Sequence, residues 1–565
     1  MKILLTAINA KYIHSNLAVY SLRAYAQSRV TDPDTEIALA EYTINQQTDD
    51  ILMDIYRRKP DVLCFSCYIW NIFYVETVLQ EVHKVLPDTK IWLGGPEVSY
   101  DAVAVLKRLP EVTGVMKGEG EETFAELAEG MELVGLQGIT WRREDGEIIE
   151  NPWRPVMDLN KVPFVYEDMA DFEHKIIYYE SSRGCPFRCS YCLSSIDKIL
   201  RFRNVEKVKP ELQFFIDHKV PQVKFVDRTF NCSHQHAMEI WKYIAEHDNG
   251  ITNFHFEVAA DLLNEEEIAL IQTMRPGLIQ LEIGVQSTNP DTVKEIHRTM
   301  DFEKVSENVR AVQKNGNVHQ HLDLIAGLPY ENLKSFHRSF NDVYALHPEQ
   351  LQLGFLKVLK GSYMQEHQAE YGLVVKNIPP YEVLYTDWLP YDDVLRLKGI
   401  EEMVEVYYNS GQFTQTMPEL EKYFKDPFIM YADMAAYYDK NGYFKINHKR
   451  AARYEILLEF VKEYAPEQMD VVREFLTYDY YLRENAGNRP EFAGEYQMDK
   501  AEVRAFYEEE AESHKYLPGY EKYDRNQMRK MTHLERFLCL NKTVLFDYRE
   551  RSPLTHEART VIIAK

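Results

Sequence analysis

Three cysteines stand close together in the stretch SSRGCPFRCSYCLSS, which covers residues 181–195. Cys185, Cys189 and Cys192 follow the spacing C-x3-C-x2-C, directly after a predicted strand, IIYYESS. The Gly-Cys-Pro sequence at the first cysteine bends the chain, which helps three thiolates to converge on one object. Soft thiolate ligands favour iron–sulfur clusters, zinc or copper(I). The loop therefore predicts a metal centre with three cysteine ligands.

Two other interpretations of the loop are weaker. A structural zinc site needs a fourth cysteine or histidine nearby, and the closest ones, His174 and Cys232, belong to separate predicted elements. The three thiols could also be ordinary loop residues, but clustered cysteines in an intracellular chain usually have a chemical role.

Composition narrows the class of protein. A chain of 565 residues has room for two to four domains. The net charge of −24 argues against a general nucleic-acid coat, although it leaves room for a local basic groove. Seven cysteines, three of them clustered, do not fit a disulfide framework in a chain this long. We therefore expect a cytoplasmic protein.

The N-terminus and the apolar runs agree with that location. The stretch MKILLTAINAKYIHS has an apolar run too short for a signal peptide, and it is predicted to form a buried first strand. We find no run of eighteen apolar residues, so no membrane span is expected.

The elements that must position the cysteines follow a regular pattern. Residues 1–150 alternate apolar strands with amphipathic helices, which predicts an α/β, doubly wound (Rossmann-like) sheet; its strands are KILLTAI, EIALAEYTI, DVLCFSCYI, KIWLGG and VTGVM. Segment 138–170 indicates a small hairpin and a linker, and we place the linker proper at residues 151–173.

The alternation restarts in residues 174–380. Six strands with helices between them predict a partial (β/α)6 barrel of the TIM type, whose active groups collect at the carboxyl ends of the strands; the strands are IIYYESS, VKFVD, FHFEVAAD, IQLEIGVQ, HQHLDLIAGL and LQLGFLKV. Residues 381–565 are rich in tyrosine at helical spacings and predict a mainly α-helical domain with a packed core.

The cysteine pattern, with Tyr191 just before the last cysteine, resembles that of the radical S-adenosylmethionine (SAM) superfamily, which also has a partial barrel. The resemblance implies that Cys185, Cys189 and Cys192 hold a [4Fe–4S] cluster whose fourth iron is left open to chelate SAM. It further implies that the reduced cluster cleaves SAM to a 5′-deoxyadenosyl radical, which takes a hydrogen atom from an unreactive carbon. An external electron donor, such as flavodoxin or ferredoxin, is then needed.

The same resemblance assigns SAM-binding roles to residues at the ends of the barrel strands. Each of them, taken alone, could equally be a strand-end cap or part of the barrel core. The predicted SAM-binding residues are Tyr191, Asp227, Glu257, Glu282, Gln286 and Gly327.

Three loops at the carboxyl ends of the first sheet are suited to a large flat ligand, because such folds bind ligands at that edge and glycines let the backbone approach closely. They are CFSCYIWN, GGPEVS and GEGEE. Upstream of a radical SAM core they resemble the cobalamin-binding domain of B12-dependent radical SAM proteins, more narrowly those with a C-terminal DUF4080 domain. The predicted cobalamin-binding residues are Asn9, Ser66, Tyr68, Gly94, Gly95, Pro96, Glu97, Gly118, Glu119 and Gly120.

One departure from related B12 domains concerns the cobalt ligand. Domains of the methionine-synthase type carry D-x-H-x-x-G after the first strand, whereas here Tyr12 and Leu17 occupy the Asp and Gly positions around His14. We therefore expect a base-off cobalamin whose lower face is shielded by something other than histidine, with Tyr68 and Trp70 as candidates. Cys64 and Cys67 are expected to be core residues.

The leading hypothesis is a cobalamin-dependent radical SAM methyltransferase acting on an unactivated carbon of an unknown small-molecule or peptide substrate. In that class one SAM methylates cob(I)alamin and a second provides the radical. A B12-dependent rearrangement or redox reaction is the alternative. A third possibility is a tRNA- or rRNA-modifying enzyme, for which Arg529, Lys530 and Arg536 could line a groove, but the acidic chain makes nucleic acid a less favoured partner. A cofactor sensor without catalysis is disfavoured by the complete barrel.

Overall fold

The computed structural model describes residues 1–166, 168–196 and 199–563. It divides into two compact units, which are described separately below. The first unit comprises Met1–Asn332 and Gly354–Tyr391, and the second comprises Leu333–Leu353 and Asp392–Lys565.

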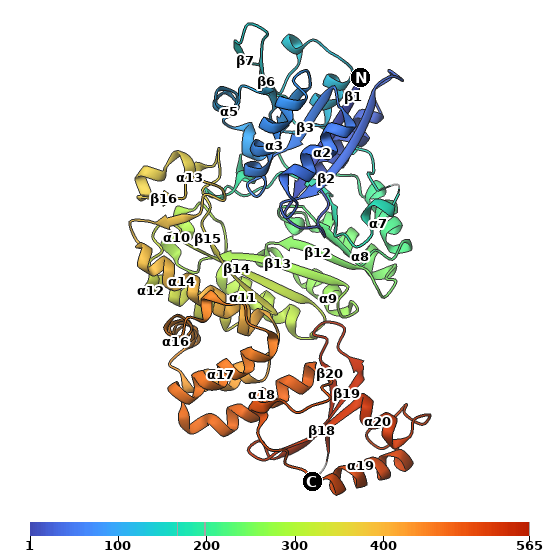
Figure 1. The fold of residues 1–565 in the computed structure, drawn as a ribbon, viewed down its shortest axis with the longest axis vertical. Coiled ribbons are helices and arrows are strands. Elements are labelled where there is room, and N and C mark those ends of the chain that lie inside the picture. The colour runs from blue at the N-terminus through green and yellow to red at the C-terminus, as the bar shows by residue number, and fades with distance from the viewer. Residues whose placement is uncertain (167, 197–198, 564–565) are drawn as a thin grey trace. The chain divides into compact units, whose positions relative to one another are not determined.

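The N-terminal part of the first unit is a seven-stranded sheet in the order β2-β1-β3-β4-β5-β6-β7 (Figure 1). The first five strands pair in parallel, as predicted for a doubly wound fold. They are β1 (Lys2–Asn9), β2 (Glu36–Thr43), β3 (Val62–Ser66), β4 (Lys90–Gly94) and β5 (Val112–Met116). The crossover helices are α1 (Leu17–Gln27), α2 (Thr48–Arg58), α3 (Ile72–Val85), α4 (Pro96–Ser99), α5 (Ala102–Arg108) and α6 (Glu121–Ala128).

The predicted hairpin after this sheet is present but is not separate from it. Strands β6 (Ile139–Arg142) and β7 (Ile148–Glu150) extend the sheet, because β6 pairs antiparallel with β5. The apolar residues of β6, Ile139 and Trp141, are thereby buried.

The barrel that follows has its six strands in the order β15-β14-β13-β12-β11-β8, which confirms the predicted partial (β/α)6 arrangement. The strands are β8 (Ile177–Tyr179), β11 (Gln222–Phe225), β12 (Asn253–Val258), β13 (Ile279–Gln286), β14 (His319–Ala326) and β15 (Gln350–Phe355). The helices between them are α7 (Val205–Asp217), α8 (His234–Glu246), α9 (Glu265–Thr273), α10 (Pro290–Glu295), α11 (Phe302–Gln313) and α12 (Leu333–Tyr344).

Alternation of side chains along the barrel strands places apolar residues on one face of the sheet and polar residues on the other. On β12, Phe254 and Phe256 are buried, and Phe256 meets Trp241 of α8 at 6.0 Å between ring centroids. His255 and Glu257, in the alternate positions, therefore face the side of the sheet away from that helix. The inner face of the barrel is thus polar where its outer face is aromatic.

The second unit is mainly helical, as predicted. Its principal helices are α14 (Tyr391–Val404), α16 (Pro427–Lys440), α17 (Arg450–Tyr464), α18 (Met469–Arg483), α19 (Lys500–Ser513) and α20 (Arg525–Met531). Tyr437 and Tyr438 are buried among the helices, and Tyr481 is buried against His533 and Phe546 near the end of the chain.

One part of the second unit was not predicted. Its final residues form an antiparallel sheet, β18 (Thr532–Phe537), β19 (Lys542–Arg551) and β20 (Ala558–Ile563). Leu534, Val544 and Phe546 are almost wholly buried on it. The sheet accounts for the apolar residues between the charged ones in this segment.

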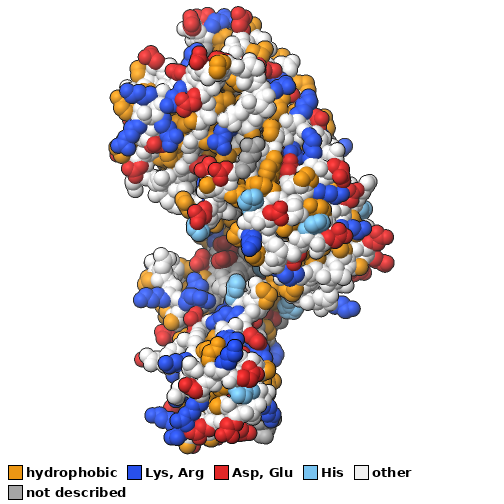
Figure 2. All heavy atoms as spheres, turned by 90° about the vertical axis from the view of Figure 1, so that its right-hand side faces the viewer, with side chains coloured by type: hydrophobic (Ala, Val, Ile, Leu, Met, Phe, Trp, Pro, Cys, Tyr) orange, Lys and Arg blue, Asp and Glu red, His pale blue; other side chains and the backbone are white. Residues whose placement is uncertain are grey.

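Basic and acidic side chains are intermixed on the face of the molecule shown in Figure 2. No helix among the described residues is long and apolar enough to cross a membrane. Of the basic residues considered for a nucleic-acid groove, Arg536 is paired with Glu502 at 2.9 Å, whereas Arg529 and Lys530 are exposed on α20.

Candidate functional site

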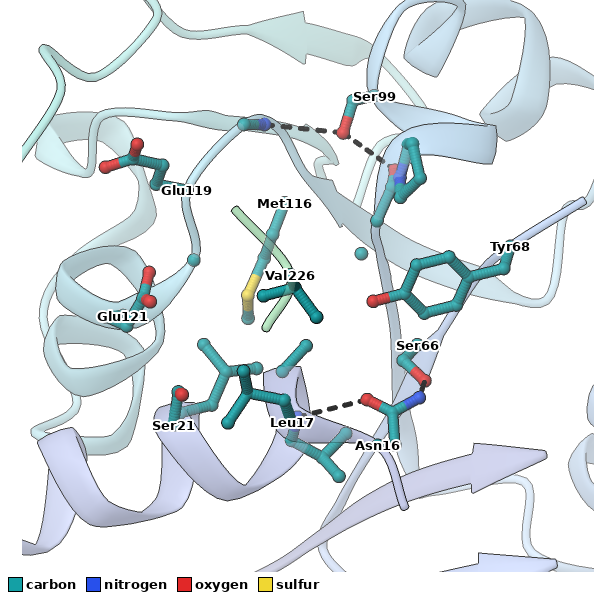
Figure 3. Close-up of a pocket in the computed structure, with 18 of the residues that line it drawn as sticks. Asn16, Leu17, Ser21, Ser66, Tyr68, Ser99, Met116, Glu119, Glu121 and Val226 are labelled. Carbon is teal, nitrogen blue, oxygen red and sulfur yellow. Dashed lines mark hydrogen bonds between the residues drawn. The ribbon is translucent and has the colours of Figure 1, made fainter. Parts of the chain in front are cut away.

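A cavity of about 740 Å³ lies at the carboxyl edge of the first sheet. Its walls come from the ends of β1, β3, β4 and β5 and from the start of α1 (Figure 3). The barrel closes it with Tyr178, Val226 and Arg228, and the cysteine loop contributes Arg183 and Gly184. One continuous space therefore joins the first sheet to the mouth of the barrel.

Glycines let the backbone form part of this wall. Gly95 has a φ of +114°, and a Cβ there would lie 2.5 Å from the Cys67 carbonyl oxygen, so no other residue fits without a backbone shift. The Ser99 hydroxyl donates to the Gly95 carbonyl at 2.8 Å and accepts from the Gly118 amide at 3.3 Å. Ser99 thus ties the second and third loops together beside the cavity (Figure 3).

Nine of the ten residues predicted to bind cobalamin line this cavity. They are Asn9, Ser66, Tyr68, Gly94, Gly95, Pro96, Gly118, Glu119 and Gly120. Asn16 at the start of α1 joins them: its side-chain amide donates to Ser66 Oγ at 3.1 Å. These assignments stay predictions, but the geometry brings the residues together around one space.

The tenth residue, Glu97, is not among the residues that line the cavity, and its predicted role stays a prediction. Its side chain is 4% exposed, and its carboxylate lies 3.2 Å from Lys360 Nζ and accepts a hydrogen bond from Tyr381. Glu97 follows Pro96 in α4, where the helix turns its side chain toward the segment after the barrel. These contacts hold that segment against the first sheet.

The loop after β3 carries a flat aromatic surface. The rings of Tyr68 and Trp70 stack with centroids 4.4 Å apart and planes 7° from parallel. Both residues line the cavity, and 43% of Trp70 is exposed. This stack remains our candidate for the shield of the lower cobalamin face.

His14 has a partner that occupies one of its ring nitrogens. Its Nδ1 lies 2.6 Å from the Tyr178 hydroxyl, and its backbone bridges to Ile176 at the barrel entrance. Burial and the charges of Lys11 and Lys224 lower the pKa of His14. These contacts agree with a histidine that joins the sheet to the barrel rather than one that ligates cobalt.

The cysteine loop is closed at its base by a short antiparallel ladder. Strands β9 (Ser182–Arg183) and β10 (Arg201–Phe202) pair so that Arg183 stands opposite Arg201. Gly184, with a φ of +93°, passes so close that a Cβ there would lie 2.6 Å from the Ile199 carbonyl oxygen. Within the loop, Cys189 is buried and the other two thiols are partly exposed.

The three thiols are not gathered around a point. Among the residues that the structure describes, no three Cys, His, Asp or Glu side chains are arranged to hold a metal ion. Assignment of the cluster to Cys185, Cys189 and Cys192 therefore rests on the chemistry of the thiolate donors and on their spacing. It stays a prediction.

A buried arginine accompanies Cys189. Arg298, which follows α10, places Nη1 3.7 Å from Cys189 Sγ and 3.2 Å from the Tyr191 hydroxyl. Burial raises the pKa of the Cys189 thiol, and the guanidinium opposes that rise. The predicted SAM-binding residue Tyr191 therefore lies within the cysteine loop, where its hydroxyl accepts a hydrogen bond from Arg298.

Asp227 contacts residues just before the cysteine loop. It is fully buried and accepts hydrogen bonds from the Ser181 amide at 2.9 Å, the Ser181 hydroxyl at 2.7 Å and the Ser182 hydroxyl at 2.5 Å. Burial raises its pKa to about 7. With its oxygens directed at Ser181 and Ser182, Asp227 supports the base of the cysteine loop, and its predicted contact with SAM stays a prediction.

Glu282 and Glu257 lie on the polar inner face of the barrel. Glu282 sits 2.9 Å from Lys224 Nζ and 3.0 Å from His255 Nε2. Burial alone would raise the pKa of Glu282, but these two partners lower it to about 2. Glu257 has no such partner, and burial raises its pKa to about 7, although Arg228 and Lys224 oppose the shift.

The two other predicted barrel residues have unusual backbones. Gln286 has a φ of +71°, and its side-chain oxygen is buried without a hydrogen-bond partner. Gly327 has a φ of +87°, and a Cβ there would lie 2.7 Å from Val383. Strained backbone and an unsatisfied polar atom at strand ends are typical of ligand sites.

Three family descriptions match successive parts of the chain. Residues 3–128 match the B12 binding domain, residues 179–343 match the radical SAM superfamily, and residues 369–562 match DUF4080, a protein domain of unknown function. The chain is a radical SAM protein with a B12-binding domain and a DUF4080 domain. It is therefore an enzyme, and its cofactors are a [4Fe–4S] cluster, SAM and cobalamin.

Curated relatives match part of this chain. An uncharacterized methyltransferase of Pyrococcus horikoshii is 23% identical over 62% of this chain and 77% of its own length. The cobalamin-dependent radical SAM methyltransferase TokK of Streptomyces tokunonensis is 26% identical over 49% of this chain, which spans 44% of TokK. The anaerobic magnesium-protoporphyrin IX monomethyl ester cyclase of Rubrivivax gelatinosus is 22% identical over 54% of this chain and 58% of its own length.

A solved structure has the same fold. The cobalamin-dependent SAM radical enzyme OxsB, in a form with aqua-cobalamin and SAM bound, superposes with a TM-score of 0.60 at 16% identity. The match covers 84% of this chain and 78% of that chain.

The residues of the enzyme suit two of its cofactors by their chemistry. The glycine-lined cavity offers backbone and an aromatic stack to a large flat ligand, and three soft thiolates on one loop suit an iron–sulfur cluster. SAM would lie between them, beside Tyr191 and the polar face of the barrel.

Several site residues were missed by sequence reasoning. Lys224 and His255 carried a usable signal, because each is a polar residue between apolar neighbours in its strand. Arg298 and Arg201 carried none, since both lie outside the strand-end motifs and reach the site only through tertiary contacts.

Proposed function

We propose that this enzyme transfers a methyl group to an unactivated carbon of a small-molecule or peptide substrate. The observation that carries the proposal is the single cavity shared by the first sheet and the barrel mouth. A ligand bound on the glycine loops faces Arg228 and Val226 of the barrel with no wall between. Substrate held there would meet both cofactors.

The cofactors supply a strong reductant, a carbon-centred radical and a methyl carrier. The chain supplies position and shielding. Gly95 and Gly118 bring backbone up to the flat ligand, the Tyr68–Trp70 stack covers one side of it, and Arg298 keeps a positive charge beside Cys189.

Glu257 is the residue best placed to meet substrate inside the barrel. Its side chain is partly buried on the inner face, and this desolvation raises its pKa to about 7. A group of this kind can accept or donate a proton near neutral pH. We propose that it recognises a polar group of the substrate.

The test uses the anaerobically reconstituted chain with SAM, titanium(III) citrate as reductant, and hydroxocobalamin added or withheld. We expect 5′-deoxyadenosine in both samples and S-adenosylhomocysteine only with cobalamin, because methyl donation by SAM leaves S-adenosylhomocysteine. A Cys189→Ala chain, as control, should give no 5′-deoxyadenosine. If cobalamin is bound and no S-adenosylhomocysteine forms, methyl transfer is ruled out.

A second candidate is a radical rearrangement or ring-forming oxidation without methyl transfer, favoured by the similarity to the cyclase of Rubrivivax gelatinosus. That reaction would consume SAM to 5′-deoxyadenosine alone. The same product analysis therefore separates the two. In either case electrons must come from an external donor.

A further inference from the structure

The third glycine loop of the first sheet, GEGEE, contacts the base of the cysteine loop. Glu119 holds Arg201 with two hydrogen bonds, at 2.5 Å and 3.0 Å, and lies 3.5 Å from Arg183. Glu121, at the start of α6, accepts from Arg183 Nη2 at 2.8 Å. Two residues of the B12-binding domain therefore bind the two arginines that flank the cysteines.

The two arginines need such partners. Arg183 and Arg201 are opposite each other in the β9–β10 ladder, and like charges in that position destabilise strand pairing. Glu180 takes part of the charge of Arg183, at 2.7 Å, and Glu119 is one carboxylate partner of Arg201, at 2.5 Å. Glu119 and Glu121, which belong to the B12-binding domain, thus help to balance the positive charges of Arg183 and Arg201.

This arrangement also forms part of the cavity wall. Glu119, Glu121, Glu180 and Arg183 all line the cavity, and Figure 3 shows the two glutamates on the side opposite Tyr68. The pairs are well shielded, since the side chains of Arg183 and Arg201 are 19% and 12% exposed. Partly buried pairs are less weakened by solvent than surface pairs.

We propose that Glu119 and Glu121 are positioning residues that clamp the base of the cysteine loop, so that cobalamin in the cavity and the cluster on the loop stabilise each other. This inference rests on the proposed placement of cobalamin. A ligand that fills the cavity restrains the glutamates, and the glutamates restrain both ends of the loop. By linkage, the effect of cobalamin on the affinity for the cluster equals the effect of the cluster on the affinity for cobalamin.

The test measures iron retention in the full chain. Anaerobically reconstituted protein, with and without saturating hydroxocobalamin, is challenged with bathophenanthroline, and iron release is followed by absorbance. We expect cobalamin to slow release at least about fivefold in the natural chain, the lower end of usual coupling strengths. In the double variant Glu119→Gln, Glu121→Gln the two rates should agree within about twofold.

Glu122→Gln is the matched control. Glu122 is the next residue on α6 but faces Arg154 and Lys161, at 3.6 Å and 4.0 Å, so its loss should leave the protection by cobalamin intact. Arg201→Gln removes the partner of Glu119, so it should abolish the protection by cobalamin as the double variant does. Arg201→Lys, which keeps the charge, should restore part of the protection.

Cobalamin binding is checked first by difference absorbance, and folding of each variant by circular dichroism. If cobalamin slows iron release equally in the double variant and the natural chain, the clamp is overturned and the placement of cobalamin is not. The same holds if the natural chain binds cobalamin but releases iron no more slowly. A natural chain that binds no cobalamin would overturn the placement of that cofactor and the clamp with it. Methyl transfer does not enter the readout, so its failure would leave the clamp standing.

Discussion

Two carboxylates, one in each unit, have similar pKa values but different surroundings. Glu257, in the barrel, has a pKa raised by burial to about 7, and among the described residues no hydrogen bond or ion pair holds it. Asp479, in the second unit, is also raised by burial to about 7. Yet Asp479 accepts from the amides of Gln415 and Thr416 and from the Thr416 hydroxyl, at 2.9, 2.8 and 2.6 Å.

The contrast extends to other acids. In the second unit Glu510 accepts two backbone amides, Glu535 binds Arg489, and Asp547 binds Tyr520 and Arg559. In the first unit, Gln286 has a buried oxygen without a hydrogen-bond partner, and Glu257 stands unpaired. A raised pKa therefore marks a site only when the group also lacks partners that explain its burial. The second unit uses its buried acids to stabilise its own fold.

The largest expected effect belongs to the cysteine loop. Cys189→Ala removes the most buried of the three thiols, so iron content and 5′-deoxyadenosine formation should fall by at least about a hundredfold, since even residues behind metal ligands cost 10–100-fold. Iron analysis and chromatography of the SAM products measure this. Cys539→Ala, an exposed thiol of the second unit, is the control and should leave both unchanged.

Asp479→Ala should give the largest loss of stability. It leaves the Gln415 and Thr416 amides and the Thr416 hydroxyl without their acceptor, which costs roughly 3 kcal/mol of unfolding free energy in total. Urea denaturation followed by fluorescence measures the change. Cobalamin affinity should stay the same; a loss of affinity would contradict the division of roles between the units.

Glu257→Gln should act in the opposite direction. Because the folded pKa of about 7 exceeds the ordinary 4.5, folded protein binds the proton more tightly than unfolded protein. The contribution of Glu257 to stability is therefore present at low pH and is lost as pH rises from about 4.5 to about 7. The glutamine chain lacks this loss, so at pH 8 it should exceed the natural chain in unfolding free energy by on the order of 2 kcal/mol.

Urea denaturation at pH 5 and pH 8 measures the difference between the two chains. If Glu257→Gln destabilises equally at both values, Glu257 is a structural acid like Asp479. Substrate-dependent activity should fall in the Glu257→Gln variant, because the substitution removes the carboxyl proposed to recognise the substrate. Stability gained at a functional site commonly comes with such a loss of activity.

The smallest effect is expected at Glu474 in the second unit. Its carboxylate accepts the amides of Leu538, Cys539 and Leu540 at the turn between β18 and β19, at 2.7, 3.0 and 3.0 Å. Glu474→Gln keeps one acceptor oxygen and should cost about 1 kcal/mol. Thermal unfolding detects such a change, and no effect on iron retention should accompany it.

Structural features that depend on a short stretch of the chain could be predicted from the sequence. The cysteine spacing, the glycine loops and the two strand–helix alternations are local, and they led to the right fold and to nine of the cavity residues. The tertiary partners of polar side chains could not be predicted, because they come from distant parts of the chain. The sequence around Glu97 does not predict its contacts with Lys360 and Tyr381. The sequence around Asp227 likewise does not predict that its carboxylate accepts hydrogen bonds from Ser181 and Ser182.

The unpredicted sheet at residues 532–563 has a similar cause. Its strands alternate poorly: four consecutive residues of β19, from Val544 to Asp547, are all buried, because helices cover one face while Asp547 is satisfied by Tyr520 and Arg559 on the other. A strand buried on both faces loses the period of two that identifies it in sequence.

The short ladder between β9 and β10 bears on how the enzyme acquires its cluster. Its bonds join backbone to backbone and involve no thiol, so the two ends of the cysteine loop are brought together by the fold itself. Closing a loop in advance removes part of the chain entropy that would otherwise be lost when three ligands gather on one metal centre. The ladder therefore leaves less of the loop to be ordered when a cluster binds.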